Sequence, residues 1–256
     1  MRSLVAFLKK EALAQLRSAK LYILVGVFML LGIMNPAVAK LTPWMLEAMS
    51  ESMAQVGMNI TVTEVTVLDS WVQFFKNIPM ALIAFVLLES NIFTKEYRSG
   101  TLILSLTKGL SRLKVVLSKT FTLMTMWTVS YWLYFGITYA YTVYYWDNSV
   151  AKNLVPSVVL WWVFGLWVTS LVVWFSTLLD TNTGVLVGTG GVALASSLCS
   201  MIPKAAKYLP TFLTDGNSLV YGLKEPHEYM AALIITAAMT LVLLASSLTI
   251  FNKKQL

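Results

Sequence analysis

Six apolar stretches, each close to the length that a helix needs to cross a bilayer, limit what this chain can fold into. A hydrocarbon core roughly 30 Å thick requires about 20 predominantly apolar residues in helical form. Hydrophobic residues make up 57% of the chain and charged residues only 12%, too few to cover the surface of a soluble domain. The sequence therefore predicts an all-α integral membrane protein with six transmembrane helices, near residues 21–39, 71–93, 115–140, 158–179, 185–202 and 230–251.

The charged residues are distributed unequally between the two sides of these spans. Thirteen of the nineteen lysine and arginine residues fall on the side that holds both termini, whereas eight acidic residues fall on the other side. Because loops rich in lysine and arginine stay in the cytoplasm, we expect both termini to be cytoplasmic. The net charge of +7 then reflects loops that face anionic lipid, and no nucleic-acid partner is expected. Spans and short loops use nearly all of residues 1–256, which predicts a single transmembrane domain.

Residues 1–20 precede the first span and have the pattern of an amphipathic helix lying on the inner membrane surface. At 100° per residue, five basic side chains fall within an arc of about 100°, and apolar side chains occupy most of the remainder. Glu11 is an exception to this pattern. The helix either anchors the chain passively or moves with the first span as an elbow. Its basic residues are Arg2, Lys9, Lys10, Arg17 and Lys20.

The fifth predicted span is rich in small residues. Gly184 and Gly188 form a small-xxx-small pair, and further small residues continue along the same helix. Such a face allows two helices to approach closely in lipid. We expect these glycines to pack against another helix of the chain, with a subunit interface as the alternative.

Ionisable side chains are nearly absent from the middle of the spans. Glu89 lies toward the cytoplasmic end of the second span. The third span begins near Lys119, whose stem can follow the helix while its amine reaches the cytoplasmic headgroups. A carrier coupled to an ion gradient usually needs ionisable groups inside the membrane, so the sequence argues against one.

The residues that catalysis or metal binding would need are also missing. The single histidine, His227, lies in an outer loop beside Glu225 and Glu228, without a second histidine to complete a metal site. No G-x-x-x-x-G-K-[ST] motif occurs, so the chain has no Walker motif for ATP. We expect it to be no enzyme and to bind no metal or cofactor itself.

The segment between the second and third spans, residues 94–119, is the most informative loop. Ser99 or Thr101 can cap a short helix, Gly109 suits its end, and Ser111 can cap the helix that follows. Apolar side chains in a loop that faces water need a cover. They either dip into the inner leaflet or dock a soluble partner. The apolar set includes Leu102, Leu104 and Leu106.

This loop resembles the segment between the second and third spans of ABC-2-type permeases, the membrane subunits of bacterial ABC exporters. The usual pattern is an acidic residue, then S/G-T, a leucine-rich turn, a proline and S-R before the third span. The chain departs from it at Gly109, where proline is common. The layout of the whole chain is also similar. The matching residues are Glu96, Ser99, Gly100, Thr101, Leu102, Leu106, Thr107, Ser111, Arg112 and Lys119.

The resemblance implies a permease in the bacterial cell membrane that pairs with a second permease, identical or related, and with two separate P-loop ATPase subunits. ATP and Mg²⁺ would bind in those subunits. Closure of the ATPases would push on residues 96–112 and open a path outward. The implied coupling residues are Glu96, Ser99, Gly100, Thr101, Leu102, Leu104, Leu106, Ser111 and Arg112.

The uncharged membrane interior suits an apolar or amphipathic cargo, such as an antimicrobial peptide, an antibiotic or a lipid-like molecule. Two alternatives remain open at the level of sequence. One is a secondary carrier that works without an ATPase, and the other is a membrane scaffold subunit that transports nothing.

Overall fold

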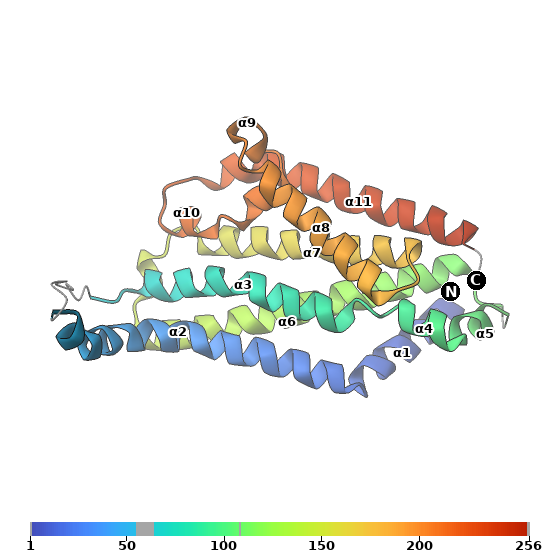
Figure 1. Ribbon diagram of the computed structural model, residues 1–256, viewed down its shortest axis with the longest axis horizontal. Helices are drawn as coiled ribbons and strands as arrows, with labels where there is room; N and C mark the ends of the chain where they lie inside the picture. The colour runs from blue at the N-terminus through green and yellow to red at the C-terminus, as the bar shows by residue number, and fades with distance from the viewer. Residues whose placement is uncertain (1, 55–63, 108, 255–256) are drawn as a thin grey trace.

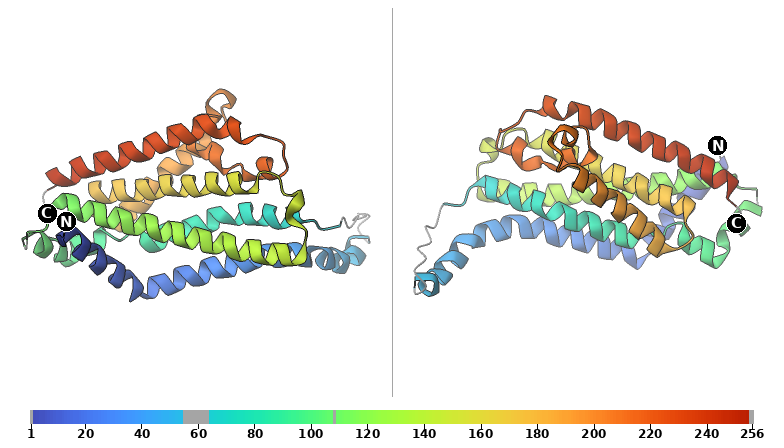
Figure 2. Two further views of the ribbon diagram at one scale, coloured as in Figure 1. Left: turned by 180° about the vertical axis from the view of Figure 1, so that it is seen from behind. Right: turned by 45° about the horizontal axis from the view of Figure 1, so that its top comes forward.

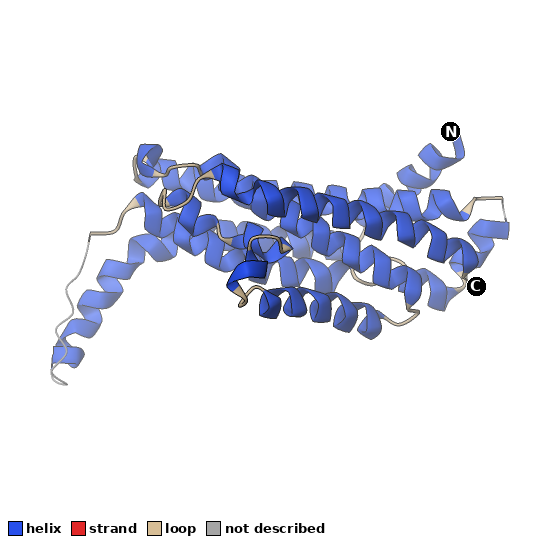
Figure 3. Ribbon diagram, turned by 90° about the horizontal axis from the view of Figure 1, so that it is seen from above, coloured by secondary structure: helices blue, strands red, loops and turns tan. Residues whose placement is uncertain are grey.

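The apolar stretches of the sequence form six long helices, most of which lie side by side along the longest axis of the molecule (Figure 1). The computed structural model describes residues 2–54, 64–107 and 109–254. Within these ranges every regular element is a helix (Figure 3). The long helices are α2 (Ala19–Ala54), α3 (Val67–Glu89), α6 (Arg112–Tyr145), α7 (Leu154–Leu178), α8 (Asn182–Cys199) and α11 (Met230–Lys253).

Five of these helices are long and apolar enough to cross a membrane. The candidate spans, searched within the described residues, are Ala19–Ala48, Val67–Ser99, Leu154–Leu178, Asn182–Cys199 and Pro226–Lys253. The predicted third span falls on α6, which is not among the five although it has 34 residues. Its many serine, threonine and tyrosine residues lower its mean hydropathy. The structure therefore shows a multi-pass membrane protein with five candidate spans rather than the six expected.

The bounds of all six long helices differ from those that we predicted for the spans, and the largest difference is at α2. Helix α2 continues to Ala54, well beyond residue 39, and passes through Pro36 and Pro43. Proline removes one backbone hydrogen bond, which a helix in a membrane tolerates where neighbouring helices support it, and α2 packs along both α3 and α6. Helix α3 ends at Glu89 rather than continuing to residue 93.

A buried polar cluster joins α2, α3 and α6. The amide nitrogen of Asn35 donates to the hydroxyls of Tyr134 and Thr138, at 2.9 Å each, and its oxygen accepts from Asn77 at 2.8 Å. The Tyr134 hydroxyl donates in turn to the carbonyl of Phe74 at 2.9 Å. Interhelical hydrogen bonds in lipid contribute about 0.6 kcal/mol each on average. The cluster thus fixes the lateral positions of three helices.

The two ends of the bundle are built differently. Helices α1 (Arg2–Leu16), α4 (Thr94–Ser99) and α5 (Thr101–Thr107) lie at the end where α6 begins and α11 finishes (Figures 1 and 2). The opposite end carries short helices between α6 and α7 and between α8 and α11. These are η1 (Asn148–Val150), α9 (Pro203–Ala206), η2 (Pro210–Thr214), α10 (Gly216–Val220) and η3 (Pro226–Tyr229).

One carboxylate organises this opposite end. Asp215 accepts from the backbone N–H of Ser218 at 3.3 Å, at the start of α10, and pairs with Lys224 at 2.7 Å. Burial alone would raise the pKa of Asp215, but the hydrogen bonds and the charge of Lys224 outweigh it, so the pKa lies below its usual value. The charged pair holds the segment between α8 and α11, in which η2 and α10 pack against α7.

The two glycines of the predicted packing pair have different neighbours. A Cβ atom on Gly188 would lie 2.5 Å from the ring of Phe175, so this glycine lets α8 lie close against α7. A Cβ on Gly184 would instead meet the side chain of Thr181, which caps the start of the same helix. Gly188 therefore lies in close contact with a neighbouring helix of the chain, whereas Gly184 lies against the turn that leads into α8.

Substitution of Gly188 by alanine should lower the stability of the protein, because overpacking a filled contact costs about 1–3 kcal/mol. The matched control is Gly190→Ala in the same helix, where an added Cβ meets nothing within 4 Å. Thermal unfolding in detergent measures both variants. A Gly188→Ala variant as stable as Gly190→Ala would show that α8 does not pack closely on α7.

Candidate coupling site

The loop that the sequence analysis selected folds as two short helices between α3 and α6. Helix α4 ends at Ser99, the next residue Gly100 has a left-handed backbone with φ +65°, and α5 begins at Thr101. A residue with a Cβ is strained in that region, which accounts for glycine at this sharp turn. Helix α1 packs against α6, which brings the N-terminal segment beside this loop. We call residues 96–112 the coupling segment.

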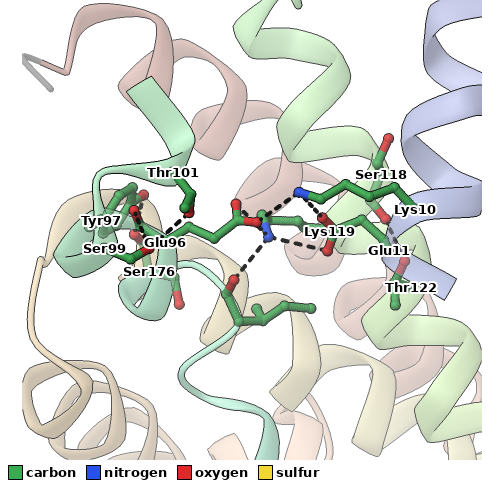
Figure 4. A network of polar contacts seen from close by, with 11 residues as sticks. Lys10, Glu11, Glu96, Tyr97, Ser99, Thr101, Ser118, Lys119, Thr122 and Ser176 are labelled. Carbon is green, nitrogen blue, oxygen red and sulfur yellow. Dashed lines mark hydrogen bonds and ion pairs between the residues drawn. The ribbon is translucent and has the colours of Figure 1, made fainter. Parts of the chain in front are cut away.

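A buried lysine lies where α1, α4 and α6 meet (Figure 4). The side chain of Lys119 is 1% exposed, and its Nζ lies 3.2 Å from a carboxylate oxygen of Glu11 and 3.0 Å from one of Glu96. Nζ also donates to the backbone carbonyl of Ile92 at 3.0 Å. The expectation that this amine reaches the headgroups is therefore wrong, because the carboxylates of α1 and α4 bind it inside the protein.

A second lysine completes the cluster on its outer side. Lys10 lies 3.1 Å from Glu96 and 3.5 Å from Glu11, and half of its side chain is exposed. Burial alone would lower the pKa of Lys10, but the two carboxylates outweigh that effect and raise the pKa above 10.5. Two lysines and two glutamates thus balance their formal charges. We call Lys10, Glu11, Glu96 and Lys119 the charge cluster.

The other end of the coupling segment is tied to the C-terminal end of α11. The guanidinium of Arg112 donates to the carbonyls of Phe251 at 3.0 Å and Asn252 at 3.1 Å, and also to that of Lys254. These carbonyls belong to the last turn of a helix, where cations are stabilising. Arg112 therefore holds α6 and α11 together, a contact that the resemblance to the permease pattern did not indicate.

Helix α4 also contacts α7 and the residue that follows α11. The Tyr97 hydroxyl donates to the carbonyl of Ser176 at 2.9 Å. The ammonium of Lys254 lies 4.4 Å from the centre of the Tyr97 ring and pairs with Asp180 at 2.6 Å. The coupling segment thus contacts α1, α6, α7 and α11 at this end.

The leucines of α5 do not share one environment. Leu102 is 1% exposed and lies in the core, and Leu106 packs partly buried against the core. Leu104 is 60% exposed and its neighbour Ile103 is 45% exposed. The apolar surface available to a partner is therefore Ile103 and Leu104, and Leu102 anchors the helix to the bundle.

The remaining predicted residues of the coupling segment are polar and lie at the helix ends. The hydroxyls of Ser99 and Thr101 are 2.8 Å apart across the turn at Gly100, and both residues are exposed. Ser111 precedes α6 at the capping position with an extended backbone, but its side chain makes no capping hydrogen bond. These residues shape the turns of the segment.

The basic residues of α1 and the start of α2 divide into two groups. Lys9 and Arg17 are exposed, as an interfacial helix requires. Lys10 and Lys20 instead bind the chain itself, since Lys20 donates to the carbonyl of Leu88 at 2.6 Å and to the side chain of Asn91. The side chain of Arg2 lies outside the described part of the structure.

Sequence reasoning missed the pairing of Glu11 with Lys119. The available signal was the position of Glu11, an acidic residue in an otherwise basic helix. Glu11 is 5% exposed, which is unusual for a carboxylate unless it is paired. Among the described residues, no group of three histidine, cysteine, aspartate or glutamate side chains is placed to hold a metal ion. The chemistry that this site offers is electrostatic and mechanical.

Substitution of Lys119 by methionine should destabilise the protein by about 3–5 kcal/mol, because it leaves two carboxylates without their buried partner. The control Lys10→Met removes the same charge from a half-exposed pair, for which a loss of about 0–1 kcal/mol is expected. Thermal unfolding in detergent compares the two variants. Equal losses would mean that burial of Lys119 does not govern the cluster.

Comparison with known proteins agrees with this arrangement of helices and loop. No curated protein matches the chain. The family described as ABC-2 family transporter protein matches residues 5–256, which includes all six long helices and the whole coupling segment. Permeases of this family normally pair with ATPase subunits. The chain belongs to the ABC-2 family of transporter proteins and is a membrane component of an ABC transporter.

Proposed function

We propose that this chain is the permease subunit of an ATP-driven ABC exporter in a bacterial cell membrane. A separate P-loop ATPase subunit hydrolyses ATP with Mg²⁺, and the permease converts the resulting motion into export of an apolar or amphipathic substrate. One observation carries this proposal. The coupling segment has an exposed apolar tip, Ile103 and Leu104, and a base fixed by ion pairs to α1 and α6.

The proposal includes α6 as a sixth span and both termini in the cytoplasm. Helix α1 and the last turn of α11 lie at the same end of the bundle, which requires an even number of crossings between them (Figure 1). Helix α6 packs against α2, α3, α7 and α11. With 34 residues at about 1.5 Å each, it is about 51 Å long and exceeds the bilayer core.

The two exposed apolar side chains of α5 support docking of a soluble partner. They stand beside the charge cluster at the end that the positive-inside rule places in the cytoplasm. A push on α5 would reach α1 through Lys10 and Glu96, α6 through Lys119, and α11 through Arg112. We propose that this is how closure of the ATPase subunits tilts the spans.

Exposed apolar faces on the long helices support a second permease, identical or related, as a further partner. In the most apolar 18-residue stretch of α8, only 11% is buried inside the chain, and the same share is buried in α11. Val187 and Leu194 of α8 are about two-thirds exposed, and so are Leu241 and Val242 of α11. Lipid alone can cover such faces, but a helix of small residues such as α8 also permits close contact with another subunit.

The two alternatives predict different behaviour. A secondary carrier would transport without any ATPase. It would need charged side chains that pass an ion across the membrane, and the described charged side chains in the spans form no such series. A scaffold subunit would bind its partners without transporting. The apolar interior favours an antimicrobial peptide, an antibiotic or a lipid-like molecule as cargo.

Single cysteines test the orientation. In a Cys199→Ser background, which removes the one exposed native thiol, Ser149→Cys should react with an impermeant maleimide in intact cells, because it lies at the end opposite the termini. Ser99→Cys should react only after permeabilisation. Both side chains belong to exposed residues. Labelling of Ser99→Cys from outside would contradict both the orientation and a cytoplasmic coupling segment.

Charge on the tip of α5 tests the docking surface. Leu104→Asp should reduce co-purification of the ATPase subunit and ATP hydrolysis by the complex at least roughly tenfold, because an unpaired carboxylate in an apolar contact costs several kcal/mol. Leu223→Asp is the matched control, since Leu223 is 77% exposed at the opposite end of the bundle. A Leu104→Asp variant that still binds its ATPase and supports hydrolysis would show that α5 is not the docking element.

A further inference from the structure

A polar cavity of about 620 Å³ lies between α1, the turn into α2, the end of α3 and α4. Five basic and three acidic side chains line it, so its formal charge is positive. The charge cluster forms one wall. The opposite wall has no role in the coupling mechanism, and it is formed by Arg17, Lys20, Glu89 and Lys95.

Two of the basic side chains in this cavity have no counter-ion. Among the described residues, neither the guanidinium of Arg17 nor the ammonium of Lys95 forms an ion pair or a side-chain hydrogen bond, and both residues are exposed. The charge of Lys95 also interacts unfavourably with that of Lys20. Unpaired like charges around one cavity favour an anionic ligand.

The cavity also contains an acceptor without a donor. Glu89 is 1% exposed, and one of its carboxylate oxygens accepts from the amide of Gln15 at 2.9 Å. The other oxygen, Oε1, is buried and has no hydrogen-bond partner in the described structure. An unpaired buried carboxylate oxygen is costly, and a ligand that carries a hydroxyl would satisfy it.

The surroundings favour a ligand with an acyl chain. An apolar groove of about 480 Å³ runs between α1, α2 and α6 on the other face of α1, and Gln15 lines both this groove and the polar cavity. A soluble phosphate compound has no acyl chain that could fill such a groove. Basic pockets beside the cytoplasmic ends of transmembrane helices are typical sites for anionic lipid headgroups.

We propose that this cavity binds the headgroup of an anionic, hydroxyl-bearing phospholipid of the inner leaflet, of the phosphatidylglycerol type. Arg17 and Lys95 bind the phosphate, Glu89 accepts a hydrogen bond from a headgroup hydroxyl, and the apolar groove takes an acyl chain. The bound lipid would hold α1 against α3 and α4. The inference relies on the proposed orientation only to place the cavity in the inner leaflet.

Native mass spectrometry of the purified permease in detergent tests the site without an ATPase or a cargo. Dioleoyl phosphatidylglycerol should bind roughly tenfold more tightly than dioleoyl phosphatidylcholine, because of its charge-assisted contacts. Dioleoyl phosphatidylethanol, which has the same charge but no headgroup hydroxyl, should bind more weakly than phosphatidylglycerol. Glycerol 3-phosphate and inorganic phosphate should not compete at concentrations similar to that of the lipid.

Three variants assign the roles. The double variant Arg17→Gln, Lys95→Gln should abolish the preference for phosphatidylglycerol over phosphatidylcholine without lowering the melting temperature, since neither side chain binds the chain itself. Glu89→Gln should reduce the difference in affinity between phosphatidylglycerol and phosphatidylethanol. Lys204→Gln, which removes an exposed charge in α9, is the control and should change nothing.

Equal binding of phosphatidylglycerol and phosphatidylcholine, or a double variant that keeps the preference, would overturn the proposal. Competition by glycerol 3-phosphate as effective as by the lipid would identify a soluble phosphate compound as the ligand and would equally overturn it. Because binding is measured on the permease alone, failure of the exporter proposal would leave these results unchanged, and the two can be judged separately.

Discussion

The arrangement at the α4–α5 end depends on one buried positive charge. Removing a lysine ammonium from water costs several kcal/mol, so Lys119 is tolerated only because two carboxylates and a carbonyl surround it. Those carboxylates come from α1 and α4, and satisfying the ammonium therefore requires both helices to pack on α6. This requirement explains why α1, which has the pattern of an interfacial helix, is held at a defined position by contacts with the protein.

The same cluster combines a strong contact with weak ones. Lys119 is enclosed, whereas Lys10 is half exposed and its pairs with Glu96 and Glu11 are screened by solvent. Helices α1 and α4 are thus joined twice, firmly through the enclosed Lys119 and weakly through the exposed Lys10. A firm and a weak contact between the same two helices suit the coupling segment that we propose, which must transmit a movement and stay bound to the bundle. The proposed lipid cavity is lined by all four residues of this cluster.

The sequence predicted the helices well and their contacts poorly, for reasons that particular residues make clear. Apolar length alone located the long helices, since each must bury or expose one continuous apolar surface. The pairing of Glu11 with Lys119 joins residues 108 positions apart, and no local pattern encodes that distance. In the seven residues of α5, periodicity could not say which leucine points inward, and the structure buries Leu102 and exposes Leu104. Nothing in the sequence around Asn35 indicated that its side chain joins three helices.

The disagreement over the number of spans, at α6, follows from where that helix lies. Hydropathy records how well a helix suits lipid, and α8 and α11 must be apolar because little of either is covered by the rest of the chain. Helix α6 contacts α1, α2, α3, α7 and α11, and its buried positions include Thr122, Ser130, Thr138 and Thr142. The Thr138 hydroxyl donates to the carbonyl of Gly32 on α2, and the hydroxyls of Thr142 and of Ser70 on α3 lie 2.7 Å apart. A helix that hydrogen-bonds to its neighbours through such groups can cross a membrane without being strongly apolar, so the low hydropathy of α6 is what its central place in the bundle allows.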